Sequence, residues 1–164
     1  MREIRVISHL LHPPLLDEIG LQAVVPWYLN SFSERSGIQI DLDMPSDISK
    51  LPDQVELAVF RVLQECLTNV HRHSGSSVAH ISLARRNNQV ILEIKDRGKG
   101  IPSELFEESG QDWLGSLGVG LRGMNERMRQ LGGRLEICSN ESGTLVTASV
   151  PAGEIVDKPS EVFQ

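Results

Sequence analysis

Three polar side chains with catalytic potential recur at a four-residue spacing in the stretch 64–73, namely Glu65, Asn69 and His73. On an α-helix, residues four apart lie on one face, so a carboxylate, a carboxamide and an imidazole would form a row. The opposite arc of such a helix is apolar and contains Val59, Leu63, Cys66, Leu67 and Val70. A helix buried on one side would therefore hold the three polar groups toward a ligand or, alternatively, toward solvent.

A second motif with chemical potential is Asp96-Arg97-Gly98-Lys99-Gly100, which directly follows an apolar, strand-like run. An acidic side chain at a strand end can accept a hydrogen bond from an exocyclic amine, and glycines let a flat base lie against the backbone. A calcium-binding loop or a plain turn is the alternative. Calcium would require further oxygen ligands, and Lys99 stands where one of them would be.

A third motif, Gly118-Val119-Gly120, precedes a stretch that we expect to be helical through about Leu131. Glycine backbone N–H groups and the partial positive charge of a helix N-terminus suit an anion such as phosphate. The motif is not a Walker loop, because no Gly-Lys-Ser/Thr follows it. Nor does it follow a strand directly, as a dinucleotide-binding glycine motif does.

The composition narrows the class of protein. The chain has 164 residues, 40% hydrophobic and 23% charged, which suits one globular domain. Its net charge of −6, without a basic stripe, argues against binding nucleic acid. No run of 18 apolar residues and no signal peptide is recognised, so we expect no membrane contact. Cys66 and Cys138 are expected to be buried, reduced thiols, which favours a cytoplasmic location.

The pattern along the chain predicts which elements position these motifs. Helices are expected over 1–12, ending at Pro13-Pro14, and over 21–32, where Pro26 marks either the start of the helix or a kink and Gly37 the stop. A strand follows at 38–43, and Asp53 is expected to be the N-cap of the helix that carries Glu65.

The second half of the chain is expected to be mainly strand. Residues 78–85 and 89–95 form a hairpin through Asn87-Asn88, and strands 134–139 and 144–150 are joined across a turn at 140–143. Residues 103–117 are polar and loosely patterned, as a mobile lid would be. The tail 154–164 is expected to be disordered.

The three motifs, in this order and at these separations, resemble the N, G1 and G2 boxes of the GHKL ATPase superfamily. The stretches 64–73 and 120–127, together with His12-Pro13-Pro14-Leu15-Leu16-Asp17, are similar to bacterial sensor histidine kinases that pair with LuxR/NarL-type response regulators. The resemblance covers about residues 4–151. It implies a two-layer α/β sandwich, with a mixed sheet and helices on one face, that binds ATP and Mg²⁺.

The resemblance also implies roles for individual residues. Glu65 would be catalytic, polarising the attacking group or reaching the metal through water. Asn69 would coordinate Mg²⁺ against the phosphates, with His73 nearby or in a packing role. Asp96 would bind the adenine amine, assisted by Thr144, and Gly98, Gly100 and Ile101 would shape the base pocket. The phosphates would be held by Gly118, Val119, Gly120 and Leu121.

One departure from the family pattern affects the expected activity. The phosphoacceptor histidine of the family stands in a Glu-x-His-Asp-like context, and none of the five histidines here has that setting. We therefore expect residues 1–14 to be a remnant of the second dimerisation helix with its linker, and residues 15–153 to be the ATP-binding catalytic domain.

Such a chain would be a monomer that binds ATP but does not phosphorylate itself. Its partners would be the dimerisation and phosphoacceptor helices of a parent kinase and, through that kinase, a response regulator. Two alternatives stay open, an anti-sigma-factor type of serine kinase and a non-catalytic nucleotide-binding module.

Overall fold

The computed structural model of the chain describes residues 14–46, 48–104 and 119–153. These residues form a five-stranded sheet with the order β1-β2-β3-β5-β4. Strands β1 (Gln39–Asp43) and β2 (Val78–Arg86) are parallel, whereas β3 (Gln89–Asp96), β5 (Gly143–Pro151) and β4 (Arg134–Asn140) continue the sheet in antiparallel pairs. The sheet is therefore mixed, as the sequence predicted.

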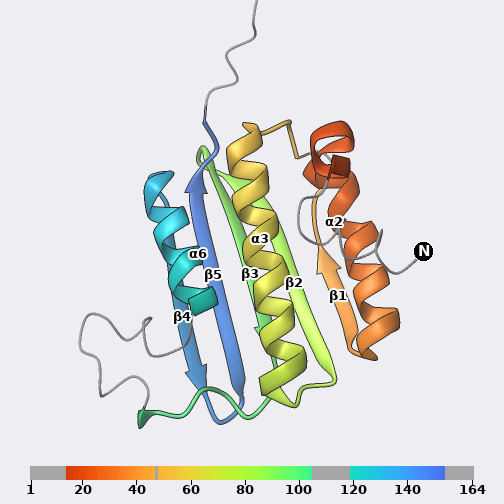
Figure 1. Cartoon of the computed structure of the whole chain (residues 1–164), viewed down its shortest axis with the longest axis vertical. Coiled ribbons are helices and arrows are strands. Elements are labelled where there is room, and N and C mark those ends of the chain that lie inside the picture. The colour runs from red at the N-terminus through yellow and green to blue at the C-terminus, as the bar shows by residue number, and fades with distance from the viewer. Residues whose placement is uncertain (1–13, 47, 105–118, 154–164) are drawn as a thin grey trace, which may run out of the picture.

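Helices cover one face of this sheet, in the order α2 (Pro14–Ser36), α3 (Asp53–Asn69) and α6 (Val119–Gln130) (Figure 1). Burial alternates along the strands to match. In β3, Val90, Leu92 and Ile94 are buried, whereas Gln89, Glu93 and Lys95 are exposed and Ile91 is half-buried. This alternation is the signature of a sheet with one face packed and the other solvated. The predicted two-layer α/β sandwich is confirmed.

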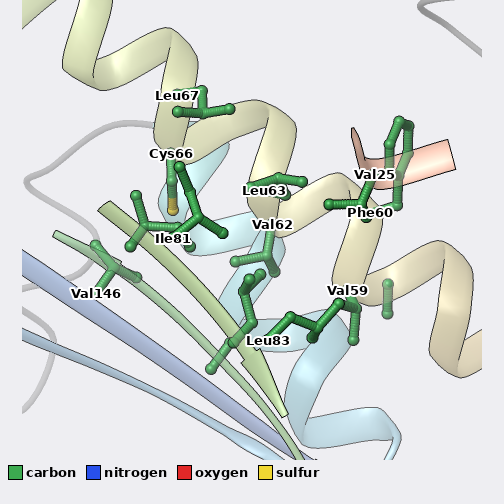
Figure 2. Close-up of a cluster of buried hydrophobic side chains, with 14 of the residues drawn as sticks. Val25, Val59, Phe60, Val62, Leu63, Cys66, Leu67, Ile81, Leu83 and Val146 are labelled. Atoms are coloured by element: carbon green, nitrogen blue, oxygen red, sulfur yellow. The ribbon is translucent and has the colours of Figure 1, made fainter. Parts of the chain in front are cut away.

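The core lies between α3 and the central strands (Figure 2). Leu63 and Leu67 on the buried side of α3 and Ile81 and Leu83 on β2 are each at most 1% exposed. Leu63 and Leu67 belong, with Val59 and Cys66, to the apolar arc that the helical periodicity predicted for α3. Burial of this arc fixes the rotation of α3 about its axis, and thereby the direction in which Glu65 and Asn69 point.

Helix α2 is interrupted at Gly20 rather than at Pro26. Gly20 has φ 77° and ψ 169°, which breaks the helix, and a new helical segment starts at Leu21. Pro26 therefore lies inside that segment, and neither of the two expectations for it is met, because the helix does not start near Pro26 and the kink is at Gly20. Gly37, with φ 74°, follows the end of the helix and donates its N–H to the Ser33 carbonyl, as the predicted stop requires.

The start of α3 corrects one prediction. Asp53 is the first helical residue rather than the N-cap, which is Pro52, and no side chain caps this end. The Pro52 carbonyl oxygen instead accepts hydrogen bonds from the Val55 and Glu56 N–H groups. The polar pattern located the helix start correctly to within one residue, but a proline provides its cap through the backbone.

The end of α3 widens into the π-helical turn η1 (Val70–Ser74), and Gly75 with φ 71° ends it. The predicted hairpin is present between β2 and β3, where Asn87 and Asn88 both have positive φ. Cys66 is buried as expected, but Cys138 is exposed, which corrects the expectation that both thiols are buried. Cys138 alternates with Leu135 and Ile137, which face the helices, and so lies on the other side of β4.

Several sequence expectations concern residues outside the described ranges. They are the helix over 1–12, nearly all of the lid at 103–117, Gly118 and the tail 154–164. In the residues that the structure does describe, no helix is long and apolar enough to cross a membrane.

Candidate functional site

A cavity of about 370 Å³ opens where the C-terminal end of α3 meets the ends of the central strands, at the lower end of the sheet in Figure 1. We call it the sheet-end cavity. Its lining comes from α3, η1, β3 and the loop after it, α6, β4 and β5. It consists of Cys66, Asn69, Val70, His73, Ser74, Ile94, Asp96, Lys99, Gly100, Ile101, Pro102, Leu121, Ile137, Thr144 and Val146. Its volume lies in the range of ligand pockets in proteins.

One buried carboxylate stands among mostly apolar neighbours in this cavity. Asp96 is the last residue of β3 and only 5% exposed. Its Oδ1 accepts a hydrogen bond of 2.7 Å from the Gly98 N–H, which leaves acceptor capacity on the carboxylate for a ligand. Ile94 on β3 and Val146 on β5 are paired in register and provide flat apolar surface beside it. A planar group that carries a hydrogen bond donor at its edge suits these surroundings.

Tight backbone packing explains the two glycines after Asp96. A Cβ on Gly98 would overlap the Ser74 backbone, and the neighbouring Lys99 N–H donates to the Ser74 carbonyl at 2.9 Å. Gly100 has φ 71°, and a Cβ there would overlap the Asn140 carbonyl oxygen at the β4–β5 turn. The loop is thus held between the end of α3 on one side and the last hairpin on the other, which fixes the mouth of the cavity.

The polar row on α3 divides between two surroundings. Asn69 and His73 line the cavity. Glu65 does not, because its carboxylate lies against the first turn of α6, where a Cβ on Gly120 would overlap Glu65 Oε1. A carboxylate at a helix N-terminus is favourably placed in the field of the helix. Two motifs that are 55 residues apart in the sequence are thus in contact, and a larger residue at position 120 would displace the Glu65 carboxylate.

The other predicted site residues are distributed as follows. Asp96, Gly100, Ile101, Leu121 and Thr144 line the cavity together with Asn69 and His73, whereas Glu65, Gly98, Val119 and Gly120 border it without lining it. Val119 is 91% exposed at the start of α6. Gly118 lies outside the described residues.

A serine that sequence reasoning missed connects these parts. Ser139 on β4 accepts a hydrogen bond from the Ile101 N–H at 2.8 Å and lies 2.8 Å from the Thr144 hydroxyl. Ser139 and Thr144 face each other in the antiparallel register of β4 and β5. The signal was a serine and a threonine placed symmetrically about the predicted turn at 140–143, which makes them a cross-strand pair.

Burial determines the state of the one thiol in the cavity wall. Desolvation, together with the nearby Glu65 charge, raises the pKa of Cys66 to about 12. Cys66 is therefore a neutral thiol at physiological pH and does not serve as a nucleophile, since the reactive form is the thiolate.

The donor set fits a nucleotide with a weakly held metal ion. Among the described residues, no three His, Cys, Asp or Glu side chains are grouped as metal ligands. Mg²⁺ typically binds through one or two protein oxygens together with substrate phosphates and water, and the Asn69 carboxamide oxygen is available at the cavity wall for this purpose.

Solved structures share this architecture. A histidine kinase domain from the blue-light-activated kinase of Erythrobacter litoralis EL346 superposes with a TM-score of 0.67 at 22% identity, over 80% of this chain and 61% of that one. The histidine kinase AdeS of Acinetobacter baumannii superposes with a TM-score of 0.61 at 20% identity, over 82% and 64%. At these identities the likeness shows the fold alone, a mixed sheet with helices on one face.

Residues 54–154 match the family model of histidine kinase-, DNA gyrase B- and HSP90-like ATPases, and the chain belongs to this family. It is 36% identical over 151 residues to the sensor histidine kinase MctS of Rhizobium johnstonii, covering 92% of this chain and 32% of that protein. It is 33% identical over 150 residues to the oxygen sensor histidine kinase NreB of Staphylococcus carnosus, covering 91% and 41%. The chain thus spans about a third of the length of these relatives, and membership of an ATPase family implies ATP as its ligand.

Proposed function

We propose that the chain is the ATP-binding catalytic domain of a protein histidine kinase and that ATP binds in the sheet-end cavity. The observation that carries this proposal is the buried carboxylate of Asp96 beside the apolar surface of Ile94 and Val146. Asp96 accepts a hydrogen bond from the exocyclic amine of adenine, with Thr144 beside it. Gly98, Gly100 and Ile101 shape the base pocket because they form the loop that closes it.

The triphosphate extends from the base toward Asn69, His73 and the first turn of α6. Gly118, Val119, Gly120 and Leu121 hold the phosphates there, where N–H groups of a helix start are free to donate. Asn69 would hold Mg²⁺ there, and the ion would supply positive charge next to the phosphates.

Glu65 acts on the attacking group rather than on the nucleotide. It borders the cavity at the start of α6 without lining it. A carboxylate in this place polarises an incoming histidine and accepts its proton as the new phosphorus–nitrogen bond forms and the bond to ADP breaks. Such a role affects the transfer rate, with little effect on nucleotide affinity.

The partners in this proposal are the dimerisation and phosphoacceptor helices of a parent kinase and, after transfer, a LuxR/NarL-type response regulator in the cytoplasm. The chain alone is a monomer that binds ATP, the phosphoryl donor.

Two measurements test the proposal in sequence. Titration calorimetry of the 164-residue chain with ATP and ADP should give Mg²⁺-sensitive binding. A separate helical fragment that carries a phosphoacceptor histidine is then offered with labelled ATP. Glu65→Gln should leave ATP affinity within about twofold and reduce transfer by about 100-fold or more.

Glu126→Gln, the same change at an exposed position of α6, is the matched control and should transfer at the normal rate. Absence of ATP binding at millimolar concentration would remove the nucleotide assignment. A normal transfer rate in Glu65→Gln would show that Glu65 has no catalytic role. The proposal that ATP binds in the cavity would be unaffected.

A further inference from the structure

Ser139 completes a polar row across the end of three neighbouring strands. The β3–β5 register ends at Lys95 opposite Leu145, so Asp96 and Thr144 come next on the same face, and Ser139 lies opposite Thr144 on β4. Asp96 and Thr144 line the sheet-end cavity, whereas Ser139 stands behind Thr144 and does not line it. Ser139 therefore affects a ligand only through its neighbours.

The Ser139 and Thr144 hydroxyls form one hydrogen bond of 2.8 Å, in which either oxygen can be the donor. The Ser139 oxygen already accepts the Ile101 N–H at 2.8 Å. Its single proton has two acceptors within reach, the Thr144 hydroxyl oxygen at 2.8 Å and the Gly143 carbonyl oxygen at 3.3 Å. Hydrogen bonds between two oxygens favour 2.7–2.8 Å and seldom exceed about 3.0 Å. A Ser139 proton directed at the Thr144 oxygen therefore makes the shorter of its two hydrogen bonds.

This direction fixes what Thr144 offers to the cavity. With its oxygen accepting from Ser139, the Thr144 hydroxyl is left with its own proton to donate. The cavity then presents an acceptor on Asp96 and a donor on Thr144, side by side. A 6-aminopurine presents the complementary pair, a donor at the amine and an acceptor at N1, whereas a 6-oxopurine presents the reverse.

We propose that Ser139 is a specificity-determining positioning residue, which holds the Thr144 hydroxyl as a donor and so makes the cavity prefer 6-aminopurine over 6-oxopurine nucleotides. The inference rests on the proposed nucleotide function of the cavity. The contact with Ile101 adds to it, because the same hydroxyl fixes the loop that covers the base. Without Ser139, the Thr144 hydroxyl rotates freely and can accept as readily as it donates.

The test compares ATP with ITP, which differ at this edge of the base and share the ribose and triphosphate. Calorimetry in one Mg²⁺ buffer gives the ratio of the two affinities for each variant of the full chain. Ser139→Ala should lower the ATP-to-ITP ratio by about fivefold, the value of one hydrogen bond. If Ser139 had only a structural role, its replacement would weaken the binding of ATP and ITP equally and leave the ratio of the two affinities unchanged.

Three further variants sharpen the comparison. Ser142→Ala makes the same change at an exposed position of the same turn and should keep the ratio. Ser139→Cys has nearly the same size but a weak donor, so it should lower the ratio even if the alanine variant unfolds. Adding Ser139→Ala to Thr144→Val should change the ratio no further, since the hydroxyl that Ser139 orients is already gone.

The outcomes separate this inference from the proposed function. If the wild-type chain binds ATP more tightly than ITP and Ser139→Ala and Ser139→Cys keep that ratio, the role of Ser139 is wrong and the nucleotide site stands. If the wild-type chain shows no preference, the adenine assignment of the cavity fails and the role of Ser139 fails with it.

Discussion

Asp96 is the side chain on which the proposed recognition of a ligand depends most. Its Oδ1 is occupied by the Gly98 N–H, so the loop fixes the carboxylate and the remaining acceptor capacity belongs to the cavity. A charged group that is 5% exposed is costly unless it is hydrogen-bonded. A hydrogen bond from a ligand to Asp96 therefore contributes more binding free energy than the same hydrogen bond would at the protein surface.

Asp96→Asn tests this residue with almost no change in shape. The asparagine oxygen can keep the Gly98 contact, but its NH₂ group then faces the adenine amine, donor against donor. We expect ATP affinity to fall by about tenfold or more, since a mismatched buried hydrogen bond costs about 1–3 kcal/mol.

Asp43→Asn, at an exposed position of β1, is the matched control for calorimetry and should bind normally. Unchanged affinity in Asp96→Asn would exclude Asp96 from contact with the base.

At the level of elements, two loops and a helix end hold the cavity open by close backbone packing. The loop after β3 lies between Ser74 at the end of η1 and Asn140 at the β4–β5 turn. Glycine at position 100 is required twice, by its positive φ and by the absence of a Cβ against the Asn140 carbonyl oxygen.

Gly100→Ala and Gly123→Ala should therefore have opposite effects. Alanine at 100 is strained at φ 71° and overlaps a backbone oxygen, so unfolding free energy should fall by about 2 kcal/mol or more. Gly123 is exposed within α6 and nothing lies within 4 Å of a Cβ there, so alanine should stabilise by about 1 kcal/mol. Thermal unfolding measures both changes, and equal melting temperatures for the two variants would contradict the packing argument.

Helix α3 shows which structural features could be predicted from the sequence and which could not. Helical periodicity predicted the buried arc and the polar row correctly, because side-chain direction in a helix depends on spacing alone. It could not predict that the row divides, with Asn69 in the cavity and Glu65 against Gly120, because that contact depends on how α6 docks. Nor could it predict η1, since a π-helical turn has no periodicity of its own over five residues.

The strands show the same limit. Alternation predicted all five strands and the hairpin, but not their order in the sheet. Ser139 acquires its role only when β4 and β5 pair in register and the loop after β3 folds over them. Cys138 follows directly after Ile137, and Leu135 and Ile137 are buried on the face toward the helices. Strand alternation therefore already predicts that Cys138 is exposed, contrary to the expectation of a second buried thiol.

Across the whole molecule, Glu56 links the helical layer. This buried side chain of α3 receives hydrogen bonds from the N–H groups of Leu51, in the loop before α3, and of Leu21, directly after the break at Gly20. One carboxylate thus accepts hydrogen bonds both from the start of the second segment of α2 and from the loop before α3. Helices α2 and α3 and the loop before α3 therefore depend on it.

Burial raises the pKa of Glu56 above its ordinary value of 4.5, with Asp53 adding to the rise and the two N–H donors and Lys50 opposing it. The folded chain therefore holds this proton more tightly than the unfolded chain does. Its contribution to stability is complete below pH 4.5 and is lost as the pH rises through the folded-state pKa. In the wild-type protein, the cost of keeping this carboxylate charged and buried lowers the free energy of unfolding at neutral pH.

Glu56→Gln removes that dependence while keeping an oxygen that can accept from Leu51. The difference in melting temperature between Glu56→Gln and wild type should therefore shift in favour of the variant as the pH rises from 4 to 7, because only wild type loses stability through this group. Glu34→Gln, at an exposed position of α2, should show no such trend in the same series of melts. A difference that stays constant with pH, or that moves against the variant, would mean that the two N–H donors outweigh burial and that Glu56 is charged in the folded protein at little cost.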